Sequence, residues 1–320
     1  MGSEEKKGND RQAIDVSLCF NWLVVWVVRW WESKEKRLAI VMDASSLGER
    51  FVVLAISIVC RGCALPVAWV VVKAAEKGKW QPHWERLFRQ LQGSVPPDWL
   101  VIVLADRGLY AEWLFRLLVN MKWHPFLRIN KTGTFCKAGS SQFLPLTMLL
   151  PGTNQAGSGK GSCFKAKPVT CTLLACWDDE HTDPWLVMSA LDPKQADVFW
   201  YSMRSWIESG FKHAKRAGWQ WQSTKMTDPE RATRLWLAMA VATLWVVSVG
   251  NQAEDTLPTA TFDELPPTHI ARRVSRRSKP RLIACFRRGI LAILTAMPLP
   301  LGYFKPAPWP ALSPKFFLSS

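Results

Sequence analysis

Four apolar segments rich in β-branched residues, all between residues 37 and 106, constrain the fold more than any other feature of this chain. The first, RLAIVMD, ends at Asp43, and two more follow before residue 74. After a helical stretch at 82–91, the fourth segment, WLVIVLAD, ends at Asp106. Such runs predict buried strands, and the helical patterns beside them indicate an α/β fold. The sequence therefore predicts a sheet in which two strands end in a carboxylate.

A later stretch, YSMRSWIESGFKHAK at 201–215, is polar along one side. Read as an α-helix, it places five side chains on one face about 21 Å long: Tyr201, Arg204, Glu208, Lys212 and Lys215. The apolar Trp206, Ile207 and Phe211 lie away from this face. One carboxylate among three cations predicts a charged partner. The alternative is a solvated surface helix in which Arg204 and Glu208 form an i,i+4 ion pair.

The spacing Tyr-x(2)-Arg-x(3)-Glu-x(6)-Lys in this stretch resembles the YREK signature of bacterial insertion-sequence transposases, specifically insertion-sequence family four of the DDE superfamily. The tripeptide Asp106-Arg107-Gly108 is similar to a second motif of that family. The resemblance covers residues 37–250. It implies an RNase H-like mixed sheet flanked by helices, with a β-rich insertion between the second and third carboxylates. In that fold the first and fourth strands are neighbours, which would bring Asp43 and Asp106 together.

The resemblance also implies a chemistry. Asp43, Asp106 and Glu208 would be catalytic and hold two Mg²⁺ or Mn²⁺ ions, which prefer oxygen ligands. The side chains expected to bind DNA are Tyr201, Arg204, Lys212, Lys215, Arg107, Arg272, Arg273, Arg276 and Arg277. Such proteins cut and join the terminal inverted repeats of a transposon and a target DNA, pass through a DNA hairpin, and act as homodimers on DNA in the bacterial cytoplasm.

The charge of the chain agrees with a polyanionic partner. There are 41 Lys and Arg against 26 Asp and Glu, a formal net charge of +15. Double-stranded DNA is the first expectation for such a balance, and an anionic membrane surface the second. The dense basic run near the C-terminus is either a solvated charge run or a contact to the DNA backbone.

Changes in composition predict five segments: an N-terminal helical remnant (1–36), the first part of the catalytic core (37–130), a β-rich insertion (131–198), core helices with the YREK motif (199–250) and a basic, Pro-rich tail (251–320). Within the insertion, the Gly-rich stretch 151–162 lacks the spacing of a phosphate-binding loop and predicts a flexible loop. Two tryptophans there, Trp177 and Trp185, are candidates for stacking on a flipped base, with core packing as the alternative.

Eight cysteines without a compact framework predict reduced thiols in the core. Two apolar stretches, 18–31 and 235–249, are shorter than the roughly 20 residues of a membrane-spanning helix and predict buried core helices.

Other functions remain open besides an active transposase. The short N-terminal segment is compatible with a truncated copy that binds DNA ends without cutting them. An RNase H-like nuclease without a transposition role would not need the cationic stripe, and a membrane protein is the most distant alternative.

Overall fold

The computed structural model describes residues 14–76, 80–130, 132–148, 154–177, 183–255, 284–295 and 304–311. The four arginines expected to bind DNA in the tail, Arg272, Arg273, Arg276 and Arg277, lie outside the described residues.

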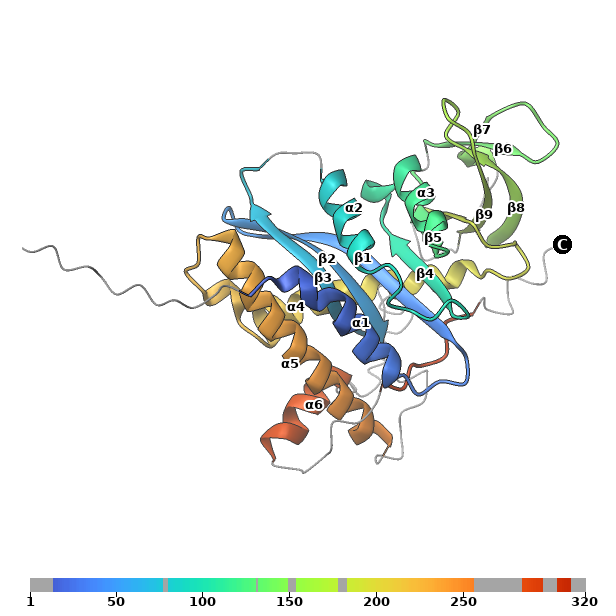
Figure 1. Ribbon diagram of the computed structural model, residues 1–320. Coiled ribbons are helices and arrows are strands. Elements are labelled where there is room, and N and C mark those ends of the chain that lie inside the picture. The colour runs from blue at the N-terminus through green and yellow to red at the C-terminus, as the bar shows by residue number, and fades with distance from the viewer. Residues whose placement is uncertain are drawn as a thin grey trace, which may run out of the picture.

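One mixed sheet organises the molecule (Figure 1). Its order is β3-β2-β1-β4-β5-β10-β9-β8-β6-β7. The strands are β1 Arg37–Leu47, β2 Phe51–Cys60, β3 Cys63–Lys73, β4 Leu100–Ala105, β5 His124–Arg128, β6 Thr134–Lys137, β7 Leu144–Pro145, β8 Gln155–Cys163, β9 Val169–Trp177 and β10 Trp185–Ser189. Strand β1 is antiparallel to β2 and parallel to β4, so the predicted pairing of the first and fourth strands is confirmed.

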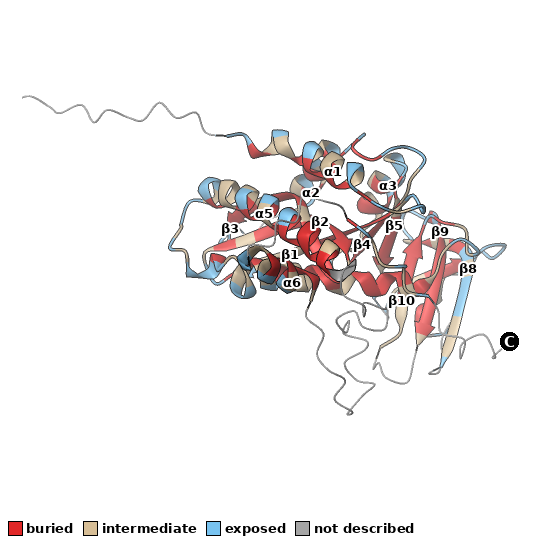
Figure 2. Ribbon diagram, turned by 90° about the horizontal axis from the view of Figure 1, so that it is seen from below, coloured by how far each residue is buried: buried red, intermediate tan, exposed pale blue. Residues whose placement is uncertain are grey.

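Helices flank this sheet on both faces. The α-helices are α1 Phe20–Arg29, α2 Gln81–Gln90, α3 Glu112–Asn120, α4 Trp206–Lys212, α5 Pro229–Asp255 and α6 Cys285–Leu294. Helices α1, α2 and α3 lie on one face and α4 on the opposite face, while α5 follows the β3 end of the sheet (Figures 1 and 2). The buried residues gather in the layers between helices and sheet (Figure 2).

The helix that carries the polar stripe is not the single α-helix that its spacing predicts. A 3-10 segment, η4 Val198–Ser205, leads into α4, and a π-helical turn, η5 His213–Ala217, follows it. Asp197 begins this stretch as an N-cap, since its carboxylate accepts from the N–H of Phe199 at 2.8 Å.

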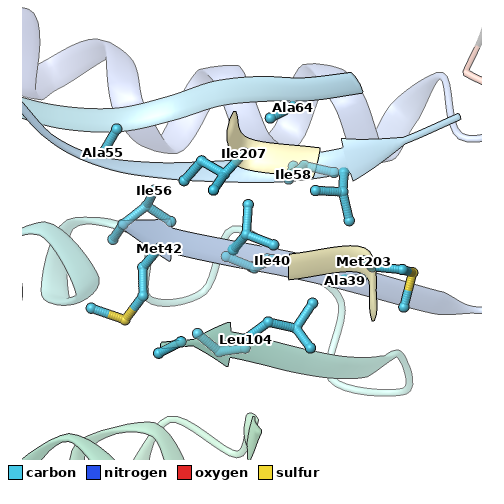
Figure 3. Close-up of a cluster of buried hydrophobic side chains, with 14 of the residues drawn as sticks. Ala39, Ile40, Met42, Ala55, Ile56, Ile58, Ala64, Leu104, Met203 and Ile207 are labelled. Carbon is cyan, nitrogen blue, oxygen red and sulfur yellow. The ribbon is translucent and has the colours of Figure 1, made fainter. Parts of the chain in front are cut away.

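Two apolar side chains fix this helix on the sheet (Figure 3). Met203 and Ile207 stand four residues apart, and each is 1% exposed. They lie in a cluster with fully buried residues of the strands, among them Ile40, Ile58 and Leu104 (Figure 3). Met203 and Ile207 directly precede Arg204 and Glu208 in the sequence, so burying the first pair positions the second.

Helix α4 also approaches β3 closely at a glycine. A Cβ placed on Gly210 would lie 2.9 Å from the Cβ of Ala64, nearer than real methyl contacts. The absence of a side chain at Gly210 therefore sets how near α4 lies to the sheet.

Residues 131–198 continue the same sheet, because β10 pairs with β5. The prediction of a flexible loop at 151–162 is wrong for residues 155–162, because β8 pairs with β9 along its whole length. Glycine suits this strand because a Cβ on Gly161 would lie 2.1 Å from the carbonyl oxygen of Cys136. Composition alone could not show that packing.

Among the described residues, one helical segment, Pro229–Ala253 of α5, is long and apolar enough to cross a membrane. Within its most apolar window, 56% of the residues are buried in the fold. It packs against β3 and α6, as the buried core helix predicted for 235–249 should. Asp228 caps it, accepting from the N–H of Glu230 at 2.9 Å. All eight cysteines are free thiols, and seven are buried, as predicted.

Candidate active site

Two carboxylates lie side by side at the carboxyl ends of adjacent parallel strands. Met42 of β1 pairs with Ala105 of β4, so Asp43 and Asp106 occupy equivalent positions one residue further along. Strand β1 continues to Leu47, four residues beyond the predicted end, while β4 stops at Ala105. Each aspartate accepts a hydrogen bond from the backbone N–H of the next residue. Oδ1 of Asp43 accepts from the Ala44 N–H at 2.8 Å, and Oδ1 of Asp106 accepts from the Arg107 N–H at 2.7 Å.

The guanidinium of Arg204 joins these aspartates to Glu208. Its Nη2 lies 2.7 Å from Oδ2 of Asp43 and 3.4 Å from Oδ2 of Asp106. Its Nη1 donates to Oε1 of Glu208 at 3.0 Å. The three carboxylates therefore converge on one cation, although Asp43 and Arg204 are 161 residues apart in sequence. The i,i+4 pair of the surface-helix alternative exists, but it belongs to a partly buried cluster of four charges.

The cluster carries an excess of negative charge in a partly buried place. Three carboxylates and one guanidinium have a formal sum of −2. Burial raises the pKa of Asp43, and the nearby negative charges of Asp106 and Glu208 raise it further. The charge of Arg204 and the hydrogen bond from the Ala44 N–H act in the opposite direction. Burial works against the charge of Arg204, but the surrounding carboxylates outweigh it, so the pKa of Arg204 is raised. A site of this kind favours a further cation.

Tyr201 does not reach the surface that its predicted role in DNA binding requires. The side chain is 4% exposed, and its hydroxyl donates to the carbonyl of Ala105 at 3.4 Å. Burial, and then the nearby charge of Asp106, raise the pKa of this phenol. The polar face of the helix packs against the ends of β1 and β4, and Tyr201, the first residue of that face, is therefore buried.

Of the other predicted DNA-binding residues in the described chain, Lys215 and Arg107 lie beside the aspartates, and Lys212 stands four residues after Glu208 in sequence. Lys215 donates from Nζ to Oγ of Ser45 at 2.8 Å and to the carbonyl of Ser46. Burial, and then Arg216, lower the pKa of Lys215. Lys212 and Arg107 are exposed, and Arg107 directly follows Asp106.

Sequence reasoning missed two neighbours of the site. Ser45 stands two residues after Asp43 on β1 and holds Lys215. Arg128 ends β5, beside the end of β4, and its charge acts on Tyr201. The signal for Arg128 was available, because a charged residue at the end of a strand next to Asp106 belongs to the same end of the sheet.

The two tryptophans proposed to stack on a base are integrated in the fold. Trp185 packs edge-on against Tyr201, with ring centroids 5.6 Å apart, and tilted against Phe199 at 5.8 Å. Trp177 ends β9 and is partly buried. For Trp185 these contacts agree with the alternative of core packing.

The donor set suits a hard divalent cation. Asp43, Asp106 and Glu208 offer only oxygens and retain 23%, 34% and 33% side-chain exposure. Across the described ranges, no group of three or more His, Cys, Asp or Glu side chains is spaced to share one ion. Here the three carboxylates are linked through Arg204 instead.

Comparisons with known proteins complete this picture. No curated protein matches the chain. Among solved structures, a cryo-EM structure of the piggyBac transposase synaptic complex with hairpin DNA aligns with a TM-score of 0.42 at 10% identity. The alignment covers 64% of this chain and 45% of that one, so this chain spans less than half of the solved protein. Residues 43–245 match the family described as Transposase DDE domain. The chain therefore belongs to the transposase DDE domain family.

Proposed function

We propose that this protein is a DNA transposase that cuts and joins the ends of an insertion sequence. The observation that carries the proposal is the convergence of Asp43, Asp106 and Glu208 on one point. Three distant parts of the chain supply these residues. Asp43 is the first residue of the matched family region, and Asp106 and Glu208 lie within it. Membership of insertion-sequence family four, the YREK group and an RNase H-like core are parts of this proposal. The strand order β3-β2-β1-β4-β5 supports the last.

Asp43, Asp106 and Glu208 would hold two Mg²⁺ or Mn²⁺ ions, which activate an attacking oxygen and stabilise a leaving oxygen in phosphoryl transfer. The chain's own part is to gather these oxygens. The register of β1 and β4 places the aspartates. The burial of Met203 and Ile207 places Glu208. Because strands and a packed helix hold the backbone of the set, the three side chains start close to one another before substrate binds.

Cations around the carboxylates would bind DNA phosphates. Lys212 and Arg107 are exposed, and Lys215 lies at the end of β1. The basic run at 272–277 adds positive charge in a chain of net +15. Double-stranded DNA, as terminal inverted repeats and as target, is the proposed partner, bound by a homodimer in the bacterial cytoplasm. Tyr201 supports the site from within.

The test is cleavage of DNA taken from the flanks of the gene, in Mg²⁺ or Mn²⁺, by wild type and Glu208→Gln. Cutting at a flanking inverted repeat that disappears in the variant supports the transposase and its third ligand together. Binding without cutting by either protein favours a binding-only copy. Cutting that persists in Glu208→Gln contradicts the metal site.

A further inference from the structure

We propose that Arg204 is an internal counter-ion that competes with divalent metal for the three carboxylates, and that a DNA phosphate opens the site to metal by drawing the guanidinium away. This inference rests on the proposed function and adds a coupling between DNA binding and metal binding. Arg204 then regulates the site as well as belonging to it.

All four carboxylate oxygens of Asp43 and Asp106 already accept a contact in this arrangement. Oδ1 of Asp43 and Oδ1 of Asp106 accept from the backbone N–H groups of Ala44 and Arg107. The remaining Oδ2 atoms face Nη2 of Arg204 at 2.7 and 3.4 Å. A metal that coordinates Oδ2 of either aspartate must therefore compete with the guanidinium. Glu208 meets the same competitor at 3.0 Å.

Charge makes the competition strong. With Arg204 in place the cluster has a formal charge of −2, and without it −3. Because attraction between charges grows with their product and is weakly screened in a partly buried site, the carboxylates would bind a divalent ion more tightly once the guanidinium leaves. When no divalent ion is bound, the guanidinium of Arg204 limits the repulsion among the carboxylates.

The guanidinium is also able to accept another partner. Its side chain is 16% exposed, and among the described residues its Nε is buried without a hydrogen-bond partner. A group that lacks one bond loses less on leaving than a fully satisfied one. Phosphate binds an arginine fork with two parallel hydrogen bonds. A DNA phosphate arriving beside the carboxylates therefore offers Arg204 an anion in exchange for those it gives up.

Linkage follows from this exchange. Metal on the carboxylates and phosphate on the guanidinium both favour the separated state, so each must strengthen the other by the same factor. Metal affinity should be weak in the free protein and rise when DNA is bound, before any bond is cut.

The first experiment measures Mn²⁺ binding without DNA, by electron paramagnetic resonance of the free ion. Arg204→Gln is expected to bind Mn²⁺ at least about fivefold more tightly than wild type, the lower end of common coupling strengths. The matched control is Arg89→Gln, because Arg89 forms an i,i+4 pair with Glu85 on the exposed side of α2. That variant should bind Mn²⁺ as wild type does. Equal or weaker affinity in Arg204→Gln overturns the inference.

The second experiment uses wild type alone and decides the question if Arg204→Gln does not fold. Mn²⁺ affinity is measured with and without a synthetic duplex from the gene's flank, after subtracting the ion bound by the duplex itself. The inference requires tighter binding with DNA, and an unchanged affinity contradicts it.

Asp43→Asn separates the inference from the function on which it rests. If wild type binds Mn²⁺, Asp43→Asn does not, and Arg204→Gln gains nothing, the metal site stands and the role of Arg204 falls. If no protein binds Mn²⁺ with or without DNA, both fall.

Discussion

Lys215 and Ser45 are 170 residues apart in sequence, yet Nζ of Lys215 lies 2.8 Å from Oγ of Ser45. Ser45 follows Asp43 by two residues on β1, so the contact holds an ammonium group at the same end of the sheet as the carboxylates. A second bond to the carbonyl of Ser46 fixes it further. A cation held by neutral oxygens keeps its full charge for an external anion.

Lys215→Ala should therefore weaken binding to DNA from the gene's flanks. Loss of one phosphate contact lowers the slope of log affinity against log salt by about 1. Fluorescence anisotropy at several salt concentrations measures that slope. Lys36→Ala is the matched control, because Lys36 precedes the opposite end of β1 and pairs with Asp98. An equal loss in both variants would show that only the net charge matters.

Tyr201→Phe should affect stability and leave DNA affinity unchanged. The hydroxyl is buried against the carbonyl of Ala105, and a lost hydrogen bond of this kind costs about 1 kcal/mol. Urea unfolding gives the stability and anisotropy gives the affinity. A marked fall in affinity with unchanged stability would instead support the contact between Tyr201 and a DNA phosphate that the sequence predicts.

Asp43→Asn should abolish cleavage and yet raise the melting temperature at pH 7, by roughly 1–3 °C. The folded-state pKa of Asp43 is raised above its ordinary value, so its ionised form destabilises the fold at neutral pH. As pH falls through the raised pKa, wild-type Asp43 takes up a proton and this penalty disappears.

The stability gap between the two proteins should therefore narrow between pH 7 and the acidic range. Scanning calorimetry at stepped pH values follows it. A variant less stable than wild type at pH 7 would mean that the ion pair with Arg204 outweighs the burial of the Asp43 charge and its repulsion from Asp106 and Glu208.

Gly210→Ala should push α4 away from β3 and lower both stability and cleavage. The added methyl would meet Ala64 at 2.9 Å, and such overpacking typically costs about 1–3 kcal/mol. Glu208 stands only two residues away, so the displacement reaches the site. Gly157→Ala in β8 is the control, since a Cβ there meets nothing within 4 Å. Comparable losses in both variants would rule out the close approach as the cause.

Local pattern predicted much of this molecule. Runs of β-branched residues identified β1 to β4, and the spacing of Glu208 from Arg204 offered their i,i+4 ion pair as an alternative, which the structure contains. Trp206, Ile207 and Phe211, which the helical period sets away from the polar stripe, are buried. These features follow from the sequence because strand and helix periods depend on nearest neighbours along the chain.

Other features depended on contacts between distant segments. The Gly-rich β8 is a strand because β9 and Cys136 lie against it, and no local signal favours a strand there. Tyr201 is sealed and Arg204 is drawn onto Asp43 and Asp106 because the polar face of their helix docks on the ends of β1 and β4. The sequence by itself determined which side chains share a face. Only the tertiary structure decided what that face meets, because desolvation and charge pairing depend on neighbours that are 96 to 161 residues away along the chain.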